Sequence, residues 1–522
     1  MTSNILGKRW AVVVTIAAVL SSVALGASAS AALGRVGSVP GAQTMPAGGN
    51  AWLFPGQCMG ADTLQHCIDD ATNGDLIQVD TDTPIPGSVT ISKSISLNSA
   101  PGFHATILGG AQITATSGTL AVYLHDLSFD GGVQVTLTGG ADHYVTLDHL
   151  TVTNGTTPGA GLSVYTSVPS TVDLTSSSFH LANGPTTQVV FETGNDTGTA
   201  RFDAIGNKLD GHGNATSSGG IQLILDGPGA ARADILDNSI WDVGGCGCVG
   251  GAGVYYRVND PATDDINVVG NTFDRAVYGV YVQTETNDGG TYGLDLFDNI
   301  ISHTTDQGIS IGFFTHASDF TLRSGDNDFS ALGLPNDYGQ YSGSSSDLTP
   351  APAYVSGSTG NLALKSTSPL IDRGVVCSPG GVATVDAAGN SRLAGPTVDI
   401  GAYEHGAVAP NGMVFIGTNA ADTSLGTNGR DILCGYGGAD ILEGNGGNDY
   451  IDGGSGSDVL IGGSGADRIF GRGGNDDVCS MDGVHGNDAV DGGPGSDGYR
   501  IDSGDTRTNV EHKTACKQPR VL

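Results

Sequence analysis

Basic residues are scarce in this sequence of 522 residues. Lysine and arginine total 21, against 54 aspartates and glutamates, and the formal net charge is −33. Binding to nucleic acid requires clustered Lys and Arg that face phosphate, so the composition argues against nucleic acid as a partner. Charged residues of either sign make up only 14% of the chain, whereas glycine occurs 84 times. This shortage of helix-favouring side chains predicts turn-rich β structure and not a helical architecture.

Long apolar runs are absent after Leu25, and no later segment is long enough to cross a bilayer. The run before it, Trp10–Leu25, follows Lys8 and Arg9 and is followed by the small residues of segment 27–29. This order predicts a cleaved secretory signal peptide over residues 1–29, with a membrane anchor as the alternative. We therefore expect a secreted or cell-surface protein without a transmembrane segment in the mature chain.

A set of His and Cys at zinc-type spacing is also missing. Of the eight cysteines, three pairs are close together or bracket a repeat segment: Cys58 and Cys67, Cys246 and Cys248, and Cys479 and Cys516. In an oxidising compartment such cysteines favour disulfides, and the pair at 246–248 has no accompanying His or Cys that would make it a zinc site. Which cysteines pair is left open by the sequence.

The carboxyl-terminal part repeats every nine residues. Six consecutive nonapeptides, the first of which is GTNGRDILC, run from Gly426 to Cys479; a degenerate copy precedes them, and two more follow a three-residue insertion at 480–482. Position six of every copy is Asp, and position eight is apolar or aromatic in all but the first. Glycines at positions one and four allow a tight turn, and the residues after the Asp form a short strand whose middle side chain points inward. Two repeats therefore complete one coil.

These stacked turns predict a site for a hard cation. Each turn stacks on the turn 18 residues away, and carboxylates with turn carbonyls supply oxygen ligands alone, which selects Ca²⁺ over zinc. The predicted ligands are Asp431, Asp440, Asp449, Asp458, Asp467, Asp476, Asp488 and Asp497. Asp422 is expected to be weak because Ala420 replaces the fourth-position glycine of its turn. Asp488 is expected to be weak because the insertion breaks its 18-residue relation to Asp467.

The nonapeptides resemble RTX, or hemolysin-type, calcium-binding repeats. The resemblance implies a calcium-binding parallel β-roll over residues 417–500. Many RTX proteins leave the cell through a carboxyl-terminal signal, and this chain departs from that pattern with its amino-terminal one. Between Gly417 and Asp505, 16 acids face 4 arginines. We therefore expect calcium binding and folding of the roll to be one event.

A looser repeat runs through residues 51–405. Asparagines recur in one register, 28 to 33 residues apart, each with an apolar residue two positions later: Asn207, Asn238, Asn271, Asn299 and Asn327. This period, with short strands and Gly/Asn/Asp turns, predicts a right-handed parallel β-helix with apolar columns and an asparagine ladder. A β-sandwich is the alternative, but its turn signals would come roughly every 8–12 residues. Segment 63–79 predicts a short amphipathic helix and a strand that cap the first coil.

The end of this region carries a second resemblance. SPLIDRG (368–374), DAAGNSR (386–392) and GPTVDIGAYE (395–404) resemble the closing segment of bacterial β-helix proteins called choice-of-anchor Q domains. The resemblance implies a fold and a surface location but no defined reaction. The predicted organisation is a signal peptide (1–29), a linker (30–50), the β-helix (51–405), a second linker (406–416), the roll (417–500) and a tail (501–522).

A weak catalytic constellation lies on one predicted face of the β-helix. Consecutive coils stack about 4.8 Å apart, which places the following residues on one face: Asp210, His212, Asp242, Asp274 and Arg275. Acids beside His and Arg suit acid–base chemistry on a uronic acid whose carboxylate the Arg neutralises. The alternative is a solvated edge, where Asp and His are ordinary turn residues. The Asp-Pro-His-Glu signature of alginate epimerases, which join a β-helix to RTX modules, is absent.

Three functions are consistent with these features. The leading hypothesis is a non-catalytic, secreted or cell-surface calcium-binding protein whose β-helix is a scaffold or a carbohydrate-binding surface. The second is a lyase, hydrolase or epimerase acting on an acidic extracellular polysaccharide. The third is a calcium-dependent adhesin or surface-layer element attached to the cell envelope. An open groove lined by Asp, Arg and aromatic residues would favour the enzyme, and a filled flank would favour the first hypothesis.

Overall fold

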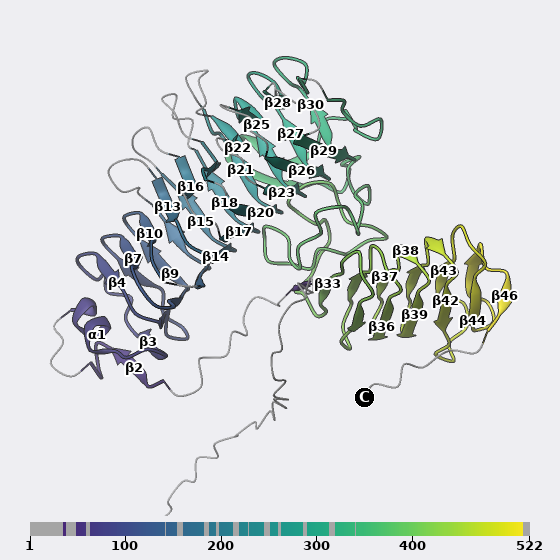
Figure 1. Ribbon diagram of the computed structural model, residues 1–522, viewed down its shortest axis with the longest axis horizontal. Helices are drawn as coiled ribbons and strands as arrows, with labels where there is room; N and C mark the ends of the chain where they lie inside the picture. Colours follow the sequence, from purple (N-terminus) through teal and green to yellow (C-terminus); the bar gives the residue numbers. More distant parts are fainter. Residues whose placement is uncertain are drawn as a thin grey trace, which may run out of the picture. The chain divides into compact units, whose positions relative to one another are not determined.

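The computed structural model describes residues 35–37, 49–58, 63–140, 142–153, 160–181, 187–194, 198–211, 219–227, 229–244, 251–258, 263–284, 290–312, 319–339 and 341–514. The protein is nearly all β, with only 3% helix, and its long sheets are parallel (Figure 1). Within the described ranges, no helix is both long and apolar enough to cross a membrane. The predicted all-β fold class, a right-handed parallel β-helix followed by a parallel β-roll, is confirmed.

Three parallel sheets form the β-helix, and each complete coil adds one strand to each sheet. The first sheet contains β2 (Ala51–Phe54), β3 (Asp75–Val79), β5 (Ile95–Ser99), β8 (Ala121–His125), β11 (His143–Asp148), β14 (Ser170–Thr175), β17 (Thr199–Ile205), β20 (Ala230–Leu236), β23 (Thr263–Val269), β26 (Thr291–Phe297) and β29 (Phe320–Gly325). The second contains β6 (Ala105–Ile107), β9 (Leu127–Phe129), β12 (Thr151–Val152), β15 (Ser178–His180), β18 (Lys208–Asp210), β21 (Ser239–Trp241), β24 (Thr272–Asp274), β27 (Ile300–Ser302) and β30 (Asp328–Ser330). The third contains β4 (Val89–Ile91), β7 (Ala111–Ala115), β10 (Val133–Leu137), β13 (Ala160–Thr166), β16 (Thr187–Thr193), β19 (Ile221–Leu225), β22 (Ala252–Val258), β25 (Tyr278–Thr284) and β28 (Ile309–Ile311).

The core of the β-helix consists of apolar columns that run from coil to coil. In the first sheet Leu147, Leu174 and Ala204 lie in register on successive strands and are fully buried. The strands alternate between buried and partly exposed residues, as in β3 and β5, because successive side chains point to opposite faces of a strand. The two-residue alternation in the sequence thus fixes which side chains face the core.

The predicted asparagine ladder is present at the corner between the first and second sheets. The Oδ1 atom of Asn238 accepts a hydrogen bond from the backbone N–H of Asn207 (3.0 Å), and Asn271 Oδ1 accepts one from Asn238 N–H (2.9 Å). Asn299 and Asn327 continue the series, and all five side chains are fully buried. The ladder satisfies backbone groups that the turn leaves unpaired inside the protein.

Helix α1 (Leu64–Asp70) lies at the amino-terminal end of the β-helix, as expected. The Thr63 hydroxyl accepts a hydrogen bond from the His66 N–H (3.2 Å) and so caps the helix amino terminus. The apolar face of α1 is buried, and α1 packs beside β4. A disulfide between Cys58 and Cys67 fastens this helix to the preceding segment.

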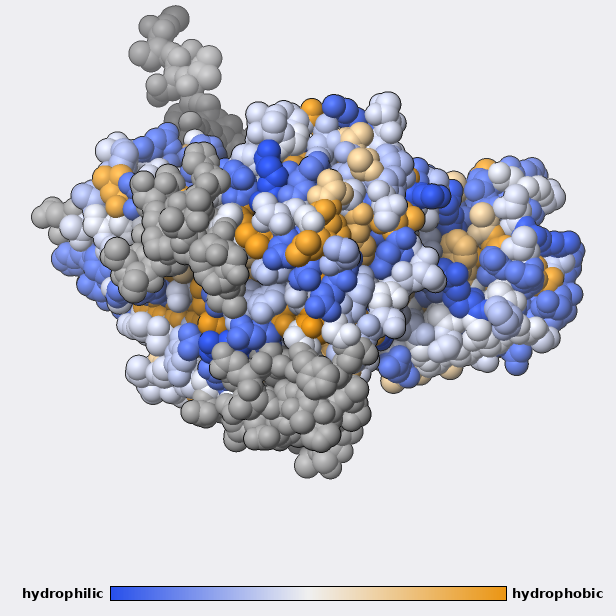
Figure 2. Space-filling model, turned by 90° about the horizontal axis from the view of Figure 1, so that it is seen from above, coloured by the Kyte–Doolittle hydropathy of each residue, from blue (hydrophilic) through white to orange (hydrophobic). Residues whose placement is uncertain are grey.

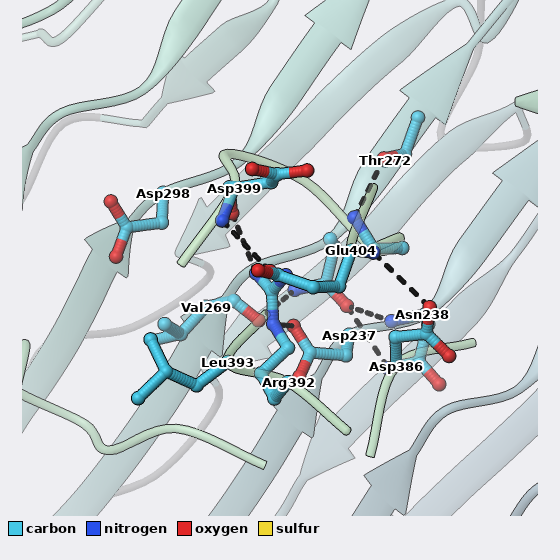
Figure 3. A network of polar contacts seen from close by, with 12 residues as sticks. Asp237, Asn238, Val269, Thr272, Asp298, Asp386, Arg392, Leu393, Asp399 and Glu404 are labelled. Atoms are coloured by element: carbon cyan, nitrogen blue, oxygen red, sulfur yellow. Dashed lines mark hydrogen bonds and ion pairs between the residues drawn. The ribbon is translucent and has the colours of Figure 1, made fainter. Parts of the chain in front are cut away.

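The segment after the last coil, residues 341–405, forms few strands, and buried carboxylates that accept hydrogen bonds hold much of it in place. It contains the antiparallel pair β31 (Tyr354–Ser356) and β32 (Asn361–Leu364), joined by the 3-10 helix η2 (Gly357–Thr359), and then irregular chain. In Figure 3 the fully buried Arg392 lies between Asp237 of the β-helix and Glu404, with Nε 3.0 Å from Asp237 Oδ1 and Nη1 3.2 Å from Glu404 Oε2. Glu404 in turn accepts backbone N–H groups of Ala394 and Asp399. These bonds hold the closing segment against the first sheet.

Two parallel sheets face each other in the β-roll. One contains β33 (Val414–Ile416), β35 (Ile432–Cys434), β37 (Tyr450–Asp452), β40 (Arg468–Phe470), β43 (Ala489–Asp491) and β45 (Thr506–Thr508), with β1 (Arg35–Gly37) antiparallel at its edge. The other contains β34 (Thr423–Leu425), β36 (Ile441–Gly446), β39 (Val459–Ser464), β42 (Asp477–Ser480), β44 (Gly498–Ile501) and β46 (His512–Lys513), and β38 (Ser455–Gly456) pairs with β41 (Gly473–Gly474). Position-eight side chains fill the narrow core, including Leu442, Ile451 and Leu460 at 0% exposure. Strand β33 lies in residues predicted to be a linker, and β45 and β46 lie in the predicted tail.

The first strands and turns of the roll are bonded to the segment that closes the β-helix. A disulfide joins Cys377 to Cys434 of β35, and both residues belong to a shared apolar cluster. The guanidinium of Arg430 donates to the carbonyl oxygens of Ala394 (3.0 Å) and Gly395 (2.9 Å). Cys479 is also disulfide-bonded, whereas Cys246, Cys248 and Cys516 lie outside the described residues. On the face displayed in Figure 2, hydrophobic residues form small patches scattered among hydrophilic ones.

Candidate metal centre

The position-six aspartates of the roll stack on one another at the predicted spacing. Asp440 N–H donates to Asp458 Oδ1 (2.8 Å), Asp449 N–H donates to Asp467 Oδ1 (3.0 Å), and Asp458 N–H donates to Asp476 Oδ1 (2.9 Å). The partners are 18 residues apart, as are the paired strands, for example Ile432↔Tyr450. One carboxylate oxygen of each Asp is therefore used to hold the neighbouring coil.

The second oxygen of these carboxylates has no hydrogen-bond partner in the part of the chain that the structure describes. Among the described residues, the Oδ2 atom is buried and makes no hydrogen bond in seven repeats: Asp440, Asp449, Asp458, Asp467, Asp476, Asp488 and Asp497. Burying an unpaired carboxylate oxygen is costly, so a row of such atoms indicates a cation-binding site.

Burial of these groups changes their acidity. Desolvation, together with the charges of Asp467 and Asp431, raises the pKa of Asp449 to about 8 against the lowering effect of the hydrogen bond from Asp431 N–H. Desolvation likewise raises the pKa of Asp440 and of Asp476 to about 7. A nearby divalent cation would favour the ionised carboxylates and reverse these shifts.

In six of these seven repeats, all but that of Asp488, glycine at position one keeps open the space in front of the unpaired oxygen. A Cβ atom on Gly435 would collide with both Asp440 Oδ2 and the carbonyl oxygen of Gly453, 18 residues further on. At position two, the non-glycine residues Tyr436 (φ 63°) and Asn445 (φ 70°) adopt the left-handed conformation. Such backbone is costly for these residues and is typical of functional turns. The donors around the space are carboxylate and carbonyl oxygens, the ligands that suit Ca²⁺.

The first two turns differ from the rest. Asp422 Oδ2 accepts hydrogen bonds from the N–H (2.6 Å) and hydroxyl (2.9 Å) of Thr418, and Asp431 Oδ2 accepts them from the N–H (2.7 Å) and hydroxyl (3.3 Å) of Thr427. Neither threonine has the positive φ found at position two of each of the five turns that follow them. These two carboxylates are therefore satisfied by protein groups. The predicted ligand set gave no weight to position two, where the threonines are the visible signal in the sequence.

The insertion at 480–482 changes the spacing between Asp467 and Asp488 from 18 to 21 residues but does not interrupt the stack, and weaker calcium binding at Asp488 stays a prediction. Asp467 N–H donates to Asp488 Oδ1 (2.9 Å), and Asp476 N–H donates to Asp497 Oδ1 (2.8 Å), both across 21 residues. Strand pairing continues with the same shift at Arg468↔Ala489. Ser480 extends β42 and pairs with Ile501, and the other two inserted residues lie in the loop that follows, which can lengthen at the surface without moving the ladder.

The stack ends on two acids that lie outside the nonapeptide pattern. Asp497 N–H donates to Glu511 Oε2 (2.7 Å), and Asp488 N–H donates to Asp505 Oδ1 (3.5 Å). Sequence reasoning missed both residues because neither occupies position six of a recognisable repeat.

The candidate catalytic residues of the β-helix are only partly brought together. The Arg275 Nε atom lies 3.7 Å from Asp274 Oδ2 and 3.9 Å from Asp242 Oδ1. Asp210 pairs with His180 (2.9 Å) and is separated from Asp274 by Trp241, which occupies the coil between them. His212 lies outside the described residues.

The β31–β32 hairpin covers this face. Arg275 lies over the ring of Trp241 (4.7 Å to the centroid) and donates to the carbonyl oxygen of Gly357 (2.7 Å) in the hairpin. Tyr354 Oη is 2.9 Å from Ser302 Oγ, which donates to the buried Asp274 (2.8 Å). The flank is therefore filled by protein at Asp274 and is not an open groove there.

Comparisons with known proteins agree with the geometry of the roll. The family model described as RTX calcium-binding nonapeptide repeat (4 copies) matches residues 416–451 and 452–484. No curated protein sequence matches the chain. Among solved structures, pectate lyase Pel9A has a TM-score of 0.42 and 14% identity, covering 68% of this chain and 96% of that one. The PL6 family alginate lyase AlyGC has a TM-score of 0.20 and 11% identity, covering 86% of this chain and 79% of that one. Residues 416–484 are therefore RTX repeats, whose cofactor is calcium, and they follow a parallel β-helix in the same chain.

Proposed function

We propose that the protein is a secreted or cell-surface calcium-binding protein in which the β-helix is a non-catalytic scaffold or carbohydrate-binding surface and the roll folds on calcium. The observation that carries this proposal is the row of seven buried Oδ2 atoms without a partner. The proposed ligands are those seven carboxylates together with turn carbonyls such as that of Gly453. Asp431 is left out of the proposed set because Thr427 occupies its carboxylate.

Calcium and folding are coupled in this proposal through the cost of the unpaired carboxylates. When bound, calcium supplies the positive charge that the stacked oxygens lack. The chain itself contributes the ladder of Asp N–H to Asp Oδ1 bonds, which orients the carboxylates in the folded roll, and the glycines that leave room for the ion. Since binding and folding are linked, calcium stabilises the roll in proportion to the logarithm of its concentration. A roll that folds only in calcium-rich surroundings suits a protein that acts outside the cell.

A scaffold role for the β-helix is supported by the covered face at Asp274. A polysaccharide-cleaving centre needs its acid and base accessible to a sugar ring, whereas Asp274 is 3% exposed beneath Tyr354 and Ser302. The enzyme hypothesis predicts turnover of acidic glycans, and the scaffold hypothesis predicts binding at most.

Calcium titration of the whole chain tests the proposal for the roll. Hydrogen exchange measured by mass spectrometry reports peptides of segment 417–514 separately from those of the β-helix. We expect protection of the roll peptides to rise steeply with calcium while the β-helix peptides remain protected throughout. Full protection of the roll in the presence of a calcium chelator would refute the coupling. Release of unsaturated sugars from pectate or alginate would favour the enzyme.

A further inference from the structure

A cluster of two histidines and one aspartate lies on the outer face of the first sheet, far along the chain from the roll. His125 is the last residue of β8, and Asp148, the last residue of β11, lies beside it in register. His149 follows directly, in the left-handed conformation (φ 53°) that turns the chain at this corner. Two successive coils thus bring both imidazoles to a single carboxylate.

The geometry around Asp148 is tight. His125 Nδ1 lies 2.8 Å from Asp148 Oδ2, and His149 Nδ1 lies 2.8 Å from Asp148 Oδ1. The ligating atoms of the three residues all lie within 4.8 Å of one another. The Asp148 side chain is 4% exposed, whereas those of His125 and His149 are 32% and 50% exposed, so the cluster is open to small solutes on one side.

Surrounding groups hold the three side chains in place. Thr175 donates its hydroxyl to Asp148 Oδ1 (2.7 Å), and the ring of Tyr123 stacks on His125 with centroids 5.6 Å apart. The ion pairs that Asp148 makes in the described part of the chain are both with histidines.

We propose that His125, Asp148 and His149 bind a first-row transition-metal dication such as zinc, at a site independent of the calcium roll. Two imidazole nitrogens with one carboxylate are a donor set for Zn²⁺ or Cu²⁺, whereas Ca²⁺ prefers oxygen alone. Three protein ligands leave coordination positions for water or an external ligand, which fits the exposed side of the cluster. Thr175 and Tyr123 act as positioning residues, because they contact the ligands and not the metal.

Zinc titration of the whole chain tests the site. The protein is stripped of transition metals, saturated with calcium so that the roll is filled, and titrated calorimetrically with zinc at neutral pH. We expect one zinc per chain, with affinity lowered more than about tenfold by His125→Asn and by His149→Asn. Asparagine tolerates the left-handed backbone at position 149, so the second variant should fold. His66→Ala, at an exposed histidine beside Asp70, is the matched control and should bind zinc normally.

A spectroscopic readout separates ligation from a structural effect. Cu²⁺ bound to the wild-type chain is expected to show magnetic coupling to two imidazole nitrogens, and to one in each histidine variant. Thermal unfolding of each variant checks that the β-helix is intact. The proposal is overturned if the wild-type chain binds no zinc, or if the double variant His125→Asn/His149→Asn binds zinc as the wild-type chain does.

Discussion

Asp449 and Asp431 both occupy position six of a repeat, but their Oδ2 atoms differ in their hydrogen bonding. Asp449 Oδ2 is buried and unpaired, whereas Asp431 Oδ2 accepts the N–H and hydroxyl of Thr427. Asparagine at either position keeps an oxygen that can accept the ladder hydrogen bond but removes the charge. We therefore expect Asp449→Asn to raise the calcium midpoint of roll folding at least about tenfold, or roughly 1.4 kcal/mol. Asp431→Asn should change the midpoint by less than about threefold.

Alanine at position 449 should do more damage than asparagine. It also removes the acceptor of the Asp431 N–H (2.9 Å), and a buried donor left without a partner costs roughly 1–3 kcal/mol. The assay is hydrogen exchange of roll peptides in the whole chain across a calcium series, with the β-helix peptides as an internal reference. Equal midpoints for Asp449→Asn and Asp431→Asn would refute the assignment of the unpaired oxygens as calcium ligands.

Three further predictions concern stability. Leu442→Asp puts an unpaired charge into the narrow roll core and should lower the free energy of unfolding by several kcal/mol. Leu425→Asp, at a side chain with 50% exposure, should lower it by less than about 1 kcal/mol. Denaturant unfolding of the calcium-saturated variants distinguishes the two. Asn271→Ala leaves buried backbone groups of the ladder unpaired and should lower stability by about 2–4 kcal/mol, and an unchanged melting temperature would contradict the ladder's role. Burial raises the pKa of Asp237 to about 8 despite Arg392, so the folded chain holds a proton that the unfolded chain releases near pH 4. The contribution of Asp237 to the free energy of unfolding is therefore full below about pH 4 and is lost as the pH rises through about 8. In the Asp237→Asn variant, the free energy of unfolding should depend less on pH between about pH 5 and 8, which denaturant unfolding at several pH values measures.

Local repetition explains why much of the fold could be predicted from the sequence. The asparagine ladder could be read because each Asn sits at the same corner of every coil, and the corner imposes one hydrogen-bonding requirement on all of them. The inward position of Leu442 and Ile451 follows from the same periodicity. A repeated structure displays its constraints many times, so a weak signal at one position becomes a clear one.

Contacts between distant, non-repeating segments could not be predicted in the same way. Arg275 meets the carbonyl oxygen of Gly357 across 82 residues, and nothing in the sequence around either residue indicates that a hairpin will cover this face. The buried role of Arg392 likewise depends on Asp237, which lies in another part of the chain. In the roll, the sequence shows a threonine at position two, Thr427, but not that this threonine donates hydrogen bonds to the Asp431 carboxylate. That contact depends on the backbone angle at position two, which is a property of the folded turn.

The ladder of aspartates in the roll has a direction. Every Asp N–H points to a carboxylate that comes later in the chain, so each coil is completed only by the coil that follows it. The last aspartates of such a ladder have no following repeat to accept their N–H groups, and here Glu511 and Asp505 accept them. For a chain that emerges amino terminus first, the last residues to appear are therefore the ones that close the stack.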